Sequence, residues 1–386
     1  MSKDVRVTLE DVITHFEDLE DPRSSINQRH PLVSVVVIAV MGVLAGASGP
    51  TGIAEWARMK KDLLLGTLEL PNGIPAKDVF RRVLAALRPD AFQSCFVSWL
   101  ESLRQAACEE GAVSQPVFAV DGKTNRRSHD RKRGLGALHA VSLWASELGL
   151  SLGQVASEEK TNEITAIPEL LRLVDLQGAI ITIDAMGTQK AIAKQIVEGG
   201  ADYVLAVKGN QESLETAIAD TFLAETEDDF ASGKVRKHET TETAHGRTTT
   251  RTYYQMPAPR SLVDSAAWAG LRTIGMVIAV CLRDGKETVE IRRYISSLGM
   301  GVQRFARAVR GHWGVENSCH WILDVVYRED DSRIRDQRAR ENFAWLDRFT
   351  LSLLKQHPSK DSIAMKRRSC GWSNDFLMEV LTGTAT

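Results

Sequence analysis

The spacing of apolar residues divides the chain into three stretches of different character. From the N-terminus to about residue 113 the apolar positions recur at helical spacing, as in VFRRVLAAL (residues 79–87). The longest apolar run, from Pro31 to Gly49, has a continuous hydrophobic part of about 15 residues, and a bilayer span needs roughly 20. We therefore predict an all-α N-terminal domain over residues 1–113, with this run as a buried core helix and no contact with a membrane.

The middle stretch changes to short apolar runs that alternate with helical segments. Three strand-like runs, VFAVDG, LHAVSLWAS and LSLGQVAS, are separated by short turns, which favours an antiparallel meander. Helices and strands then alternate up to about residue 230, and strand–helix–strand connections require parallel pairing. The predicted order is β-β-β-α-β-α-β-α, an α/β fold with a mixed sheet in a domain that spans residues 114–355.

The third stretch contains a segment rich in strand-forming residues. The threonine-rich KHETTETAHGRTTTRTYYQM and two strand-like runs around an Asp-Gly-Lys turn predict a β-rich insertion at about residues 232–298. Helical periodicity returns from about Val302 to Tyr327. Residues 356–386 are expected to form a C-terminal tail.

Composition and charge narrow the classes of function. The formal net charge of −2 provides no overall basic field, so a nucleic-acid partner would need local basic patches. The five cysteines are scattered and form no CxxC pair, which indicates a reducing compartment. We expect a cytoplasmic protein.

Two strands of the middle stretch end in an acid. Asp121 closes VFAVD and Asp184 closes IITID. If these strands are parallel neighbours, both carboxylates lie at the carboxyl edge of the sheet, where ligands collect. Close carboxylates repel unless they share a cation, and Mg²⁺ suits an all-oxygen site. A strand-terminal Asp also commonly forms a turn or caps a helix, and spacing alone leaves that alternative open.

A third acid lies in the predicted helix after Val302. Glu316 falls on the same apolar stripe as Val309 and Trp313, so we expect it to face the core. A buried Glu needs a partner, which is either a metal shared with the aspartates or an arginine such as Arg310.

Two other constellations give weaker signals. One possible zinc site consists of His312, Glu316, Cys319 and His320. Side chains of a single helix, however, cannot surround a zinc ion with four ligands in tetrahedral geometry. The sequence DGKT at residues 121–124 resembles the end of a phosphate-binding loop. The glycines that precede this end in such loops are absent here, so the signal is weak.

Basic residues flank the acids on both sides. They suit a polyanionic substrate whose phosphates they would hold, although a solvated charged surface is the alternative for each run. We count as DNA-binding candidates Lys123, Arg126, Arg127, Arg131, Lys132 and Arg133 after Asp121, Arg304, Arg307, Arg310 and His312 before Glu316, and Arg333 and Arg335 after it.

Long motifs in this chain resemble one family. FAVDGKT, LGQVASEEKTNEITAIPELLRLVDLQGAIITIDAMGTQ and RGHWGVENSCHWILDVVYREDDSRIR resemble the H-repeat-associated (ISAs-type) family of bacterial insertion-sequence transposases, and the similarity covers roughly residues 15–355. The resemblance implies a ribonuclease-H-like catalytic fold that cleaves DNA at element ends and transfers strands into target DNA. Its catalytic and metal-binding triad would be Asp121, Asp184 and Glu316.

The resemblance also implies the cofactor and the partners. Two Mg²⁺ ions, which Mn²⁺ can replace, would act on double-stranded DNA, and a homodimer or larger assembly would join two ends. Related transposases carry a Tyr-Arg-Glu-Lys signature, from which this chain departs with His312 and Leu323. The DNA contacts of that signature therefore do not carry over. The alternative functions are an inactive DNA-binding protein that keeps the fold and a phosphohydrolase that acts on small molecules.

Overall fold

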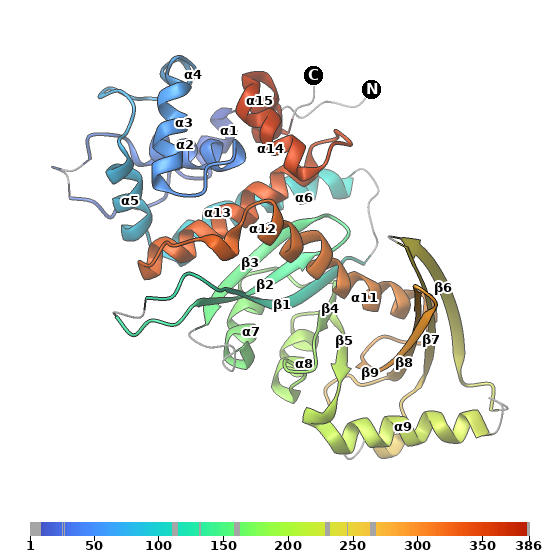
Figure 1. Ribbon diagram of the computed structural model, residues 1–386. Coiled ribbons are helices and arrows are strands. Elements are labelled where there is room, and N and C mark those ends of the chain that lie inside the picture. Colours follow the sequence, from blue (N-terminus) through green and yellow to red (C-terminus); the bar gives the residue numbers. More distant parts are fainter. Residues whose placement is uncertain are drawn as a thin grey trace.

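A nine-stranded mixed sheet runs through the molecule, with the strand order β3-β2-β1-β4-β5-β9-β8-β7-β6 (Figure 1). The computed structural model describes residues 9–24, 26, 28–109, 115–130, 133–157, 163–227, 232–244, 246–262 and 268–383. The strands are β1 (Val117–Asn125), β2 (Leu138–Ala145), β3 (Leu150–Ser157), β4 (Ile180–Ile183), β5 (Asp202–Val207), β6 (Arg236–Ala244), β7 (Arg247–Pro257), β8 (Thr273–Arg283) and β9 (Lys286–Ser296).

The first five strands pair as the pattern of the sequence predicts. β1, β2 and β3 form an antiparallel meander, and β1, β4 and β5 are parallel neighbours. The parallel strands are joined through α7 (Glu163–Arg172) and α8 (Lys190–Glu198). All four residues of β4 are buried, which explains its continuous apolar sequence. The protein is thus an α/β protein with a large mixed sheet.

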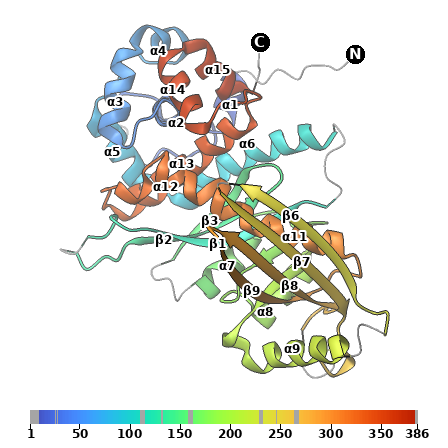
Figure 2. The same ribbon diagram turned by 45° about the vertical axis from the view of Figure 1, so that its right-hand side comes forward.

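The β-rich insertion extends this sheet. β9 pairs antiparallel with β5, and β8, β7 and β6 follow outward. Asp284 and Gly285, at φ 50° and 73°, form the two-residue turn between β8 and β9, where both residues need a positive φ. Helix α9 (Glu212–Glu227) leads from β5 to β6. Figure 2 shows the four inserted strands as a curved sheet beside α11.

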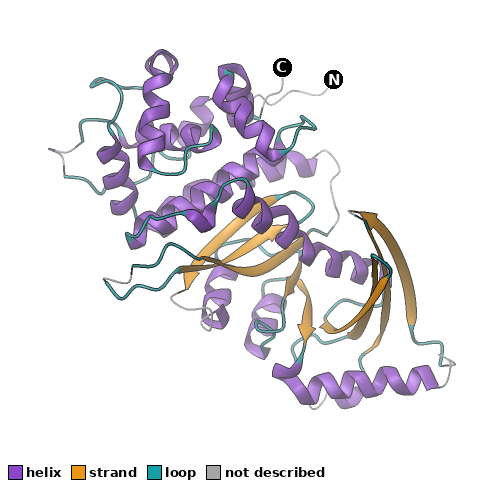
Figure 3. Cartoon of the chain, viewed as in Figure 1, coloured by secondary structure: helices purple, strands orange, loops and turns teal. Residues whose placement is uncertain are grey.

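Helices cover both faces of the sheet. α11 (Val302–Val315), a π-helical turn (Glu316–His320) and α12 (Trp321–Val325) follow one another on one face, and α7 and α8 lie on the other (Figure 3). Gly311 lets α11 approach β1 closely, because a Cβ atom there would lie 2.9 Å from Cγ1 of Val117. Its carbonyl also accepts a hydrogen bond from Oγ of Ser146 at 2.7 Å. This packing fixes the height at which Glu316 stands above the sheet.

The N-terminal helices gather at one end of the molecule. They are α1 (Leu9–Thr14), α2 (Leu32–Leu44), α3 (Pro50–Met59), α4 (Lys61–Thr67), α5 (Lys77–Ala86) and α6 (Pro89–Glu109). Every residue of α2 except Val33 is buried, so the prediction of a core helix is confirmed. Among the described residues, no helix is both long and apolar enough to span a membrane. α13 (Gln337–Gln356) packs against α2, α5 and α6 on one side and β3 on the other.

The C-terminal residues differ from the expected tail. They contain α14 (Ile363–Trp372) and α15 (Asn374–Thr382), which lie beside the N-terminal helices in Figure 1. Leu377, Val380 and Leu381 belong to the same hydrophobic core as α2. Their spacing along the chain is helical, and this apolar face needs cover.

Candidate active site

Asp121 and Asp184 lie at the same edge of the sheet. Val120 and Ile183 are register partners in the parallel pair β1–β4, and each aspartate is the next residue of its chain segment. Asp184 lies just beyond the end of β4, as predicted. Asp121 does not end its strand, because β1 continues to Asn125 through its pairing with β2. The Oδ1 atom of Asp184 accepts hydrogen bonds from the backbone N–H groups of Met186 at 3.1 Å and Gly187 at 3.2 Å. Asp184 is therefore a turn former as well, and the turn fixes the direction of its carboxylate.

Glu316 faces the same cavity. A cavity of about 160 Å³ at the carboxyl ends of β4 and β5, beside the middle of β1, is lined by all three acids, together with Thr182, Ile183, Ala185, Val204, Ala206, Lys208, Arg292, Tyr294, Val309, His312 and Trp313. The three residues of the predicted triad are thus neighbours in space, although they come from three distant segments of the chain.

The burial expected for Glu316 is wrong. Its side chain is exposed, and the neighbouring Val315 and Cys319 are buried in the core instead. Glu316 borders an open cavity together with Val309 and Trp313, so this stripe of α11 faces the cavity there and not a closed core. Sequence periodicity therefore placed Glu316 on the correct side of the helix, but it could not show that the space in front of the side chain is open.

The three acids repel one another. Burial, together with the charges of Asp184, Glu316 and Glu163, raises the pKa of Asp121 to about 7, although the hydrogen bond from the N–H group of Gly122 lowers it. Glu163 in turn accepts a hydrogen bond from Nε2 of His139 at 2.7 Å. Clustered carboxylates of this kind gain from a cation, and an all-oxygen donor set fits Mg²⁺ or Mn²⁺. Within the described part of the chain, however, no group of three His, Cys, Asp or Glu side chains is close enough together to bind a metal ion as it lies. This holds also for the possible zinc ligands His312, Glu316, Cys319 and His320.

Two histidines border this site, and neither carries a positive charge near pH 7. Burial lowers the pKa of His312 to about 4, and its Nδ1 lies 3.2 Å from Oγ1 of Thr182. His312 stays a predicted DNA contact, and at neutral pH it would make that contact through a hydrogen bond and not through a positive charge. Burial and the charge of Arg348 lower the pKa of His320 to about 3, while its Nδ1 lies 3.4 Å from Oδ2 of Asp121.

Lys123 also differs from its expected role. Its side chain is only 7% exposed, and its Nζ lies 2.6 Å from Asp324, 3.2 Å from Glu329 and 3.6 Å from Asp330. Three carboxylates thus surround the ammonium group, which leaves none of its charge for a phosphate. Sequence spacing placed Lys123 on the same side of the strand as Asp121 but could not reveal partners that lie about 200 residues further along the chain.

The basic residues that follow Lys123 remain at the surface. Arg126 and Arg127 are exposed and pair with Asp330 at 3.3 Å and Asp331 at 3.0 Å, while Arg133 lies 3.9 Å from Asp130. Arg131 and Lys132 lie outside the described residues. Exposed pairs of this kind exchange readily with other anions.

The arginines of α11 divide into two groups. Arg304 and Arg307 donate hydrogen bonds to Gln115 at 3.4 and 2.6 Å, and so fasten α11 to the segment before β1. Arg310 is exposed and pairs with Glu242 of β6. Beyond the π-helical turn, Arg333 and Arg335 are exposed.

Two basic residues of the cavity were missed from the sequence. Lys208 directly follows the apolar strand β5, just as Asp184 follows β4, and this pattern could have identified it. Arg292 comes from β9, and its guanidinium group lies 3.8 Å from the ring centre of Trp313. No pattern in the sequence brings Arg292 to the site, because only the antiparallel pairing of β9 with β5 does so.

Comparisons with known proteins show the family of this chain. A family model described as the transposase DDE domain matches residues 113–353, and a model described as DDE_Tnp_1-associated matches residues 13–100. The chain therefore belongs to the family of transposase DDE domains.

Its relatives define the branch of this family. The chain is 34% identical to the "H repeat-associated putative transposase YhhI" of Escherichia coli K12, over 97% of this chain and 99% of the relative. It is 36% identical to the "Putative transposase YncI" of Escherichia coli O157:H7, over 97% and 95% respectively. The branch is that of the H repeat-associated transposases. The match to a solved structure of the piggyBac transposase synaptic complex with hairpin DNA covers 97% of this chain and 76% of that one, at 12% identity and a TM-score of 0.40.

Proposed function

We propose that this protein is a metal-dependent DNA transposase of a bacterial insertion sequence, which cleaves DNA at the element ends and transfers the strands into target DNA. One observation carries the proposal: Asp121, Asp184 and Glu316 line a single cavity in a chain of the transposase DDE family. The meander followed by parallel strands, with Asp121 and Asp184 side by side at the end of β4, supports a ribonuclease-H-like catalytic domain.

Asp121, Asp184 and Glu316 are the residues that would hold two Mg²⁺ ions, which Mn²⁺ can replace. When bound, such ions activate a water or a 3′-hydroxyl as nucleophile and stabilise the leaving oxygen. The chain itself contributes rigidity, because β4 is buried and two backbone N–H groups hold the carboxylate of Asp184. Lys208 and Arg292 supply positive charge at the cavity wall, where a phosphodiester would enter.

Double-stranded DNA is the proposed partner. The exposed Arg126, Arg127, Arg133, Arg333 and Arg335 offer positive charge at the surface for phosphate contacts. Joining two element ends requires two active sites, so we propose that the working form is a homodimer or a larger assembly.

The test is cleavage of a labelled duplex that carries the terminal repeat found in the DNA beside the gene. We expect the wild-type protein to nick this duplex only when Mg²⁺ or Mn²⁺ is present, and Asp184→Asn to abolish the nicking while it still binds the duplex. Nicking that survives Asp184→Asn would overturn the triad. Binding without nicking by the wild-type protein would instead indicate an inactive DNA-binding protein.

A further inference from the structure

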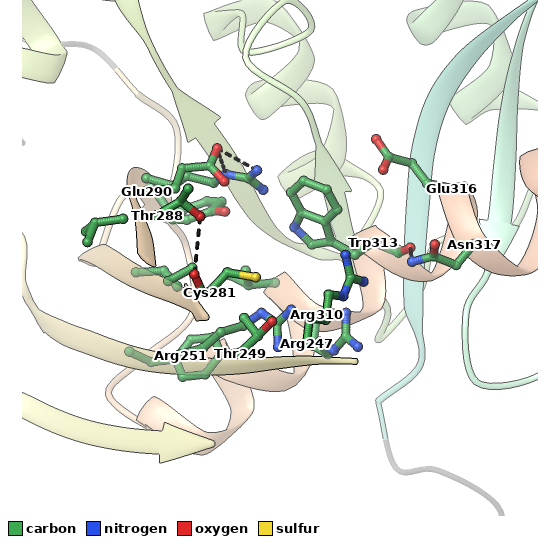
Figure 4. A pocket seen from close by; sticks show the side chains of 17 residues that line it. Arg247, Thr249, Arg251, Cys281, Thr288, Glu290, Arg310, Trp313, Glu316 and Asn317 are labelled. Atoms are coloured by element: carbon green, nitrogen blue, oxygen red, sulfur yellow. Dashed lines mark hydrogen bonds and ion pairs between the residues drawn. The ribbon is translucent and has the colours of Figure 1, made fainter. Parts of the chain in front are cut away.

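A groove lined by arginines leads into the catalytic cavity. It has a volume of about 490 Å³ and lies between α11 and the inserted strands β7, β8 and β9. Arg292, Tyr294, Val309, Trp313 and Glu316 border both the groove and the catalytic cavity. Figure 4 shows Arg247, Arg251, Arg310, Trp313 and Glu316 around this groove. A ligand in the groove would therefore reach the acids directly.

One carboxylate bridges two of these arginines. Nε and Nη2 of Arg310 donate hydrogen bonds to the two carboxylate oxygens of Glu242, at 3.1 and 2.8 Å. Nη1 of Arg251 donates to Oε2 of the same carboxylate at 3.1 Å. The three residues come from α11, β7 and β6, so the bridge joins the helix to the outer strands of the insertion.

The bridge contributes little to the fold. The side chains of Arg310 and Glu242 are 42% and 45% exposed, and ion pairs at such exposure add little stability. The arginines nevertheless hold the pKa of Glu242 below its usual range, against the effect of partial burial. The arrangement is therefore a well-formed anion site whose present occupant can be displaced.

A phosphate fits this site in place of the carboxylate. The guanidinium fork binds carboxylate and phosphate oxygens through the same paired N–H groups. Arg310 precedes Glu316 by six positions, about 9 Å along a helix axis, which corresponds to roughly three nucleotides of one DNA strand. One strand could thus contact the arginine pair and the catalytic acids together.

We propose that Arg251 and Arg310 form a binding site for a backbone phosphate of the DNA substrate, and that Glu242 occupies this site until DNA displaces it. This inference rests on the proposed function, since it identifies the path by which DNA enters the same cavity. Glu242 then acts as a competing anion, which lowers the affinity for DNA and disfavours weak, non-specific contacts.

The test measures the DNA affinity of Glu242→Gln and Arg310→Gln, each against a control variant from β6. Glu239 lies on the opposite face of β6 from Glu242, because an odd number of positions separates them, so Glu239→Gln is the control for the same change of charge. Lys237, on the same face as Glu239, provides the matching control for a lost cation. The probe is a fluorescein-labelled duplex with the terminal repeat, titrated by anisotropy at several salt concentrations.

We expect Glu242→Gln to bind the duplex roughly two- to fivefold more tightly than Glu239→Gln, which corresponds to the weak pair that DNA no longer has to break. Arg310→Gln should weaken binding more than Lys237→Gln does and reduce the slope of log affinity against log salt by about 0.9, the value for one phosphate. All four variants should melt as the wild type does, because these side chains are exposed.

The possible failures are distinguishable. If Glu242→Gln matches Glu239→Gln, and Arg310→Gln matches Lys237→Gln, while the wild type binds and nicks DNA, the anion site is overturned and the proposed function stands. If the wild-type protein binds no duplex at any salt concentration, the proposed function fails and this inference fails with it.

Discussion

Lys123 follows Asp121 by two residues, yet its ammonium group contacts carboxylates of the segment at residues 324–330 and not the catalytic acids. It lies against Glu329, which is 1% exposed and also pairs with Arg348 at 2.6 Å. This buried cluster links the catalytic strand to the segment after α12 and to α13. Sequence reasoning recognised the charge of Lys123 and its side of the strand, but the partners depend on tertiary packing and could not be predicted.

We predict that Lys123→Met destabilises the fold by about 3–5 kcal/mol, because it leaves buried carboxylate charge without a partner. Arg126→Met is the control: Arg126 is 83% exposed, and its loss should cost less than about 1 kcal/mol. Urea unfolding followed by tryptophan fluorescence measures both. If Lys123→Met is as stable as the control and weakens only DNA binding, Lys123 contacts phosphate after all.

The Glu329–Arg348 pair makes stability depend on pH. Burial alone would raise the pKa of Glu329, but the charges and hydrogen bonds of Arg348 and Lys123 outweigh burial and lower this pKa to about 2. The stabilisation is present above the ordinary glutamate pKa of about 4.3 and is lost as the pH falls toward 2.

We therefore predict that Glu329→Gln removes this dependence. The stability of the wild type relative to the variant should be greatest above pH 5 and should shrink by roughly 3 kcal/mol between pH 5 and pH 2. Urea titrations of both proteins across this range give the difference. A constant difference at every pH would mean that Glu329 is not held ionised by its partners.

At the scale of elements, the sequence predicts strands better than it predicts helix geometry. The succession of strands and helices along the chain and the position of Asp184 after β4 follow from apolar runs and their connections, which are local signals. The continuation of β1 from Asp121 to Asn125 was not predicted. The π-helical turn at Glu316 has no such signal, because its residues are equally compatible with an α-helix. Gly311 has a low intrinsic preference for a helix, but it permits the close contact of α11 with β1.

Two glycines of α11 test this contact. Gly311→Ala should destabilise the protein by about 1–3 kcal/mol, because the added methyl group would overlap Val117. Gly314→Ala should be neutral or stabilising by up to about 1 kcal/mol, since its nearest neighbours lie 3.6 Å away and alanine favours the helix. Thermal unfolding measures the stability of both variants. Equal changes in melting temperature would show that α11 is not in close contact with β1 at Gly311.

At the scale of the whole molecule, the two ends of the chain form one helical body. Arg367 of α14 donates hydrogen bonds to the carbonyl of Val43 in α2 and to that of Val326, both at 2.9 Å. Its guanidinium group also stacks on Tyr327 at 3.8 Å. The C-terminal helices thus connect the N-terminal helices to the segment that follows the active site. The local sequence pattern could not predict this connection, because its partners are far apart along the chain.

Removal of residues 358–386 should therefore unfold or severely weaken the protein. The lost hydrogen bonds and the exposed apolar faces of Leu377, Val380 and Leu381 amount to roughly 5–10 kcal/mol. Thermal melting and dye binding to exposed apolar surface measure the effect. A truncated protein that melts like the full chain would restore the description of these residues as a tail.

The central claim is that Asp121, Asp184 and Glu316 act as one unit in DNA cleavage. The most direct measurement is the initial rate of Mg²⁺-dependent nicking of an element-end duplex by Asp184→Asn, Glu316→Gln and the double variant, each shown to be folded and bound to DNA. Groups that act together are not additive, so we predict that each single variant falls to the background rate and that the double variant falls no further. A single variant that retains more than about a tenth of the wild-type rate, or losses that simply multiply in the double variant, would contradict the claim.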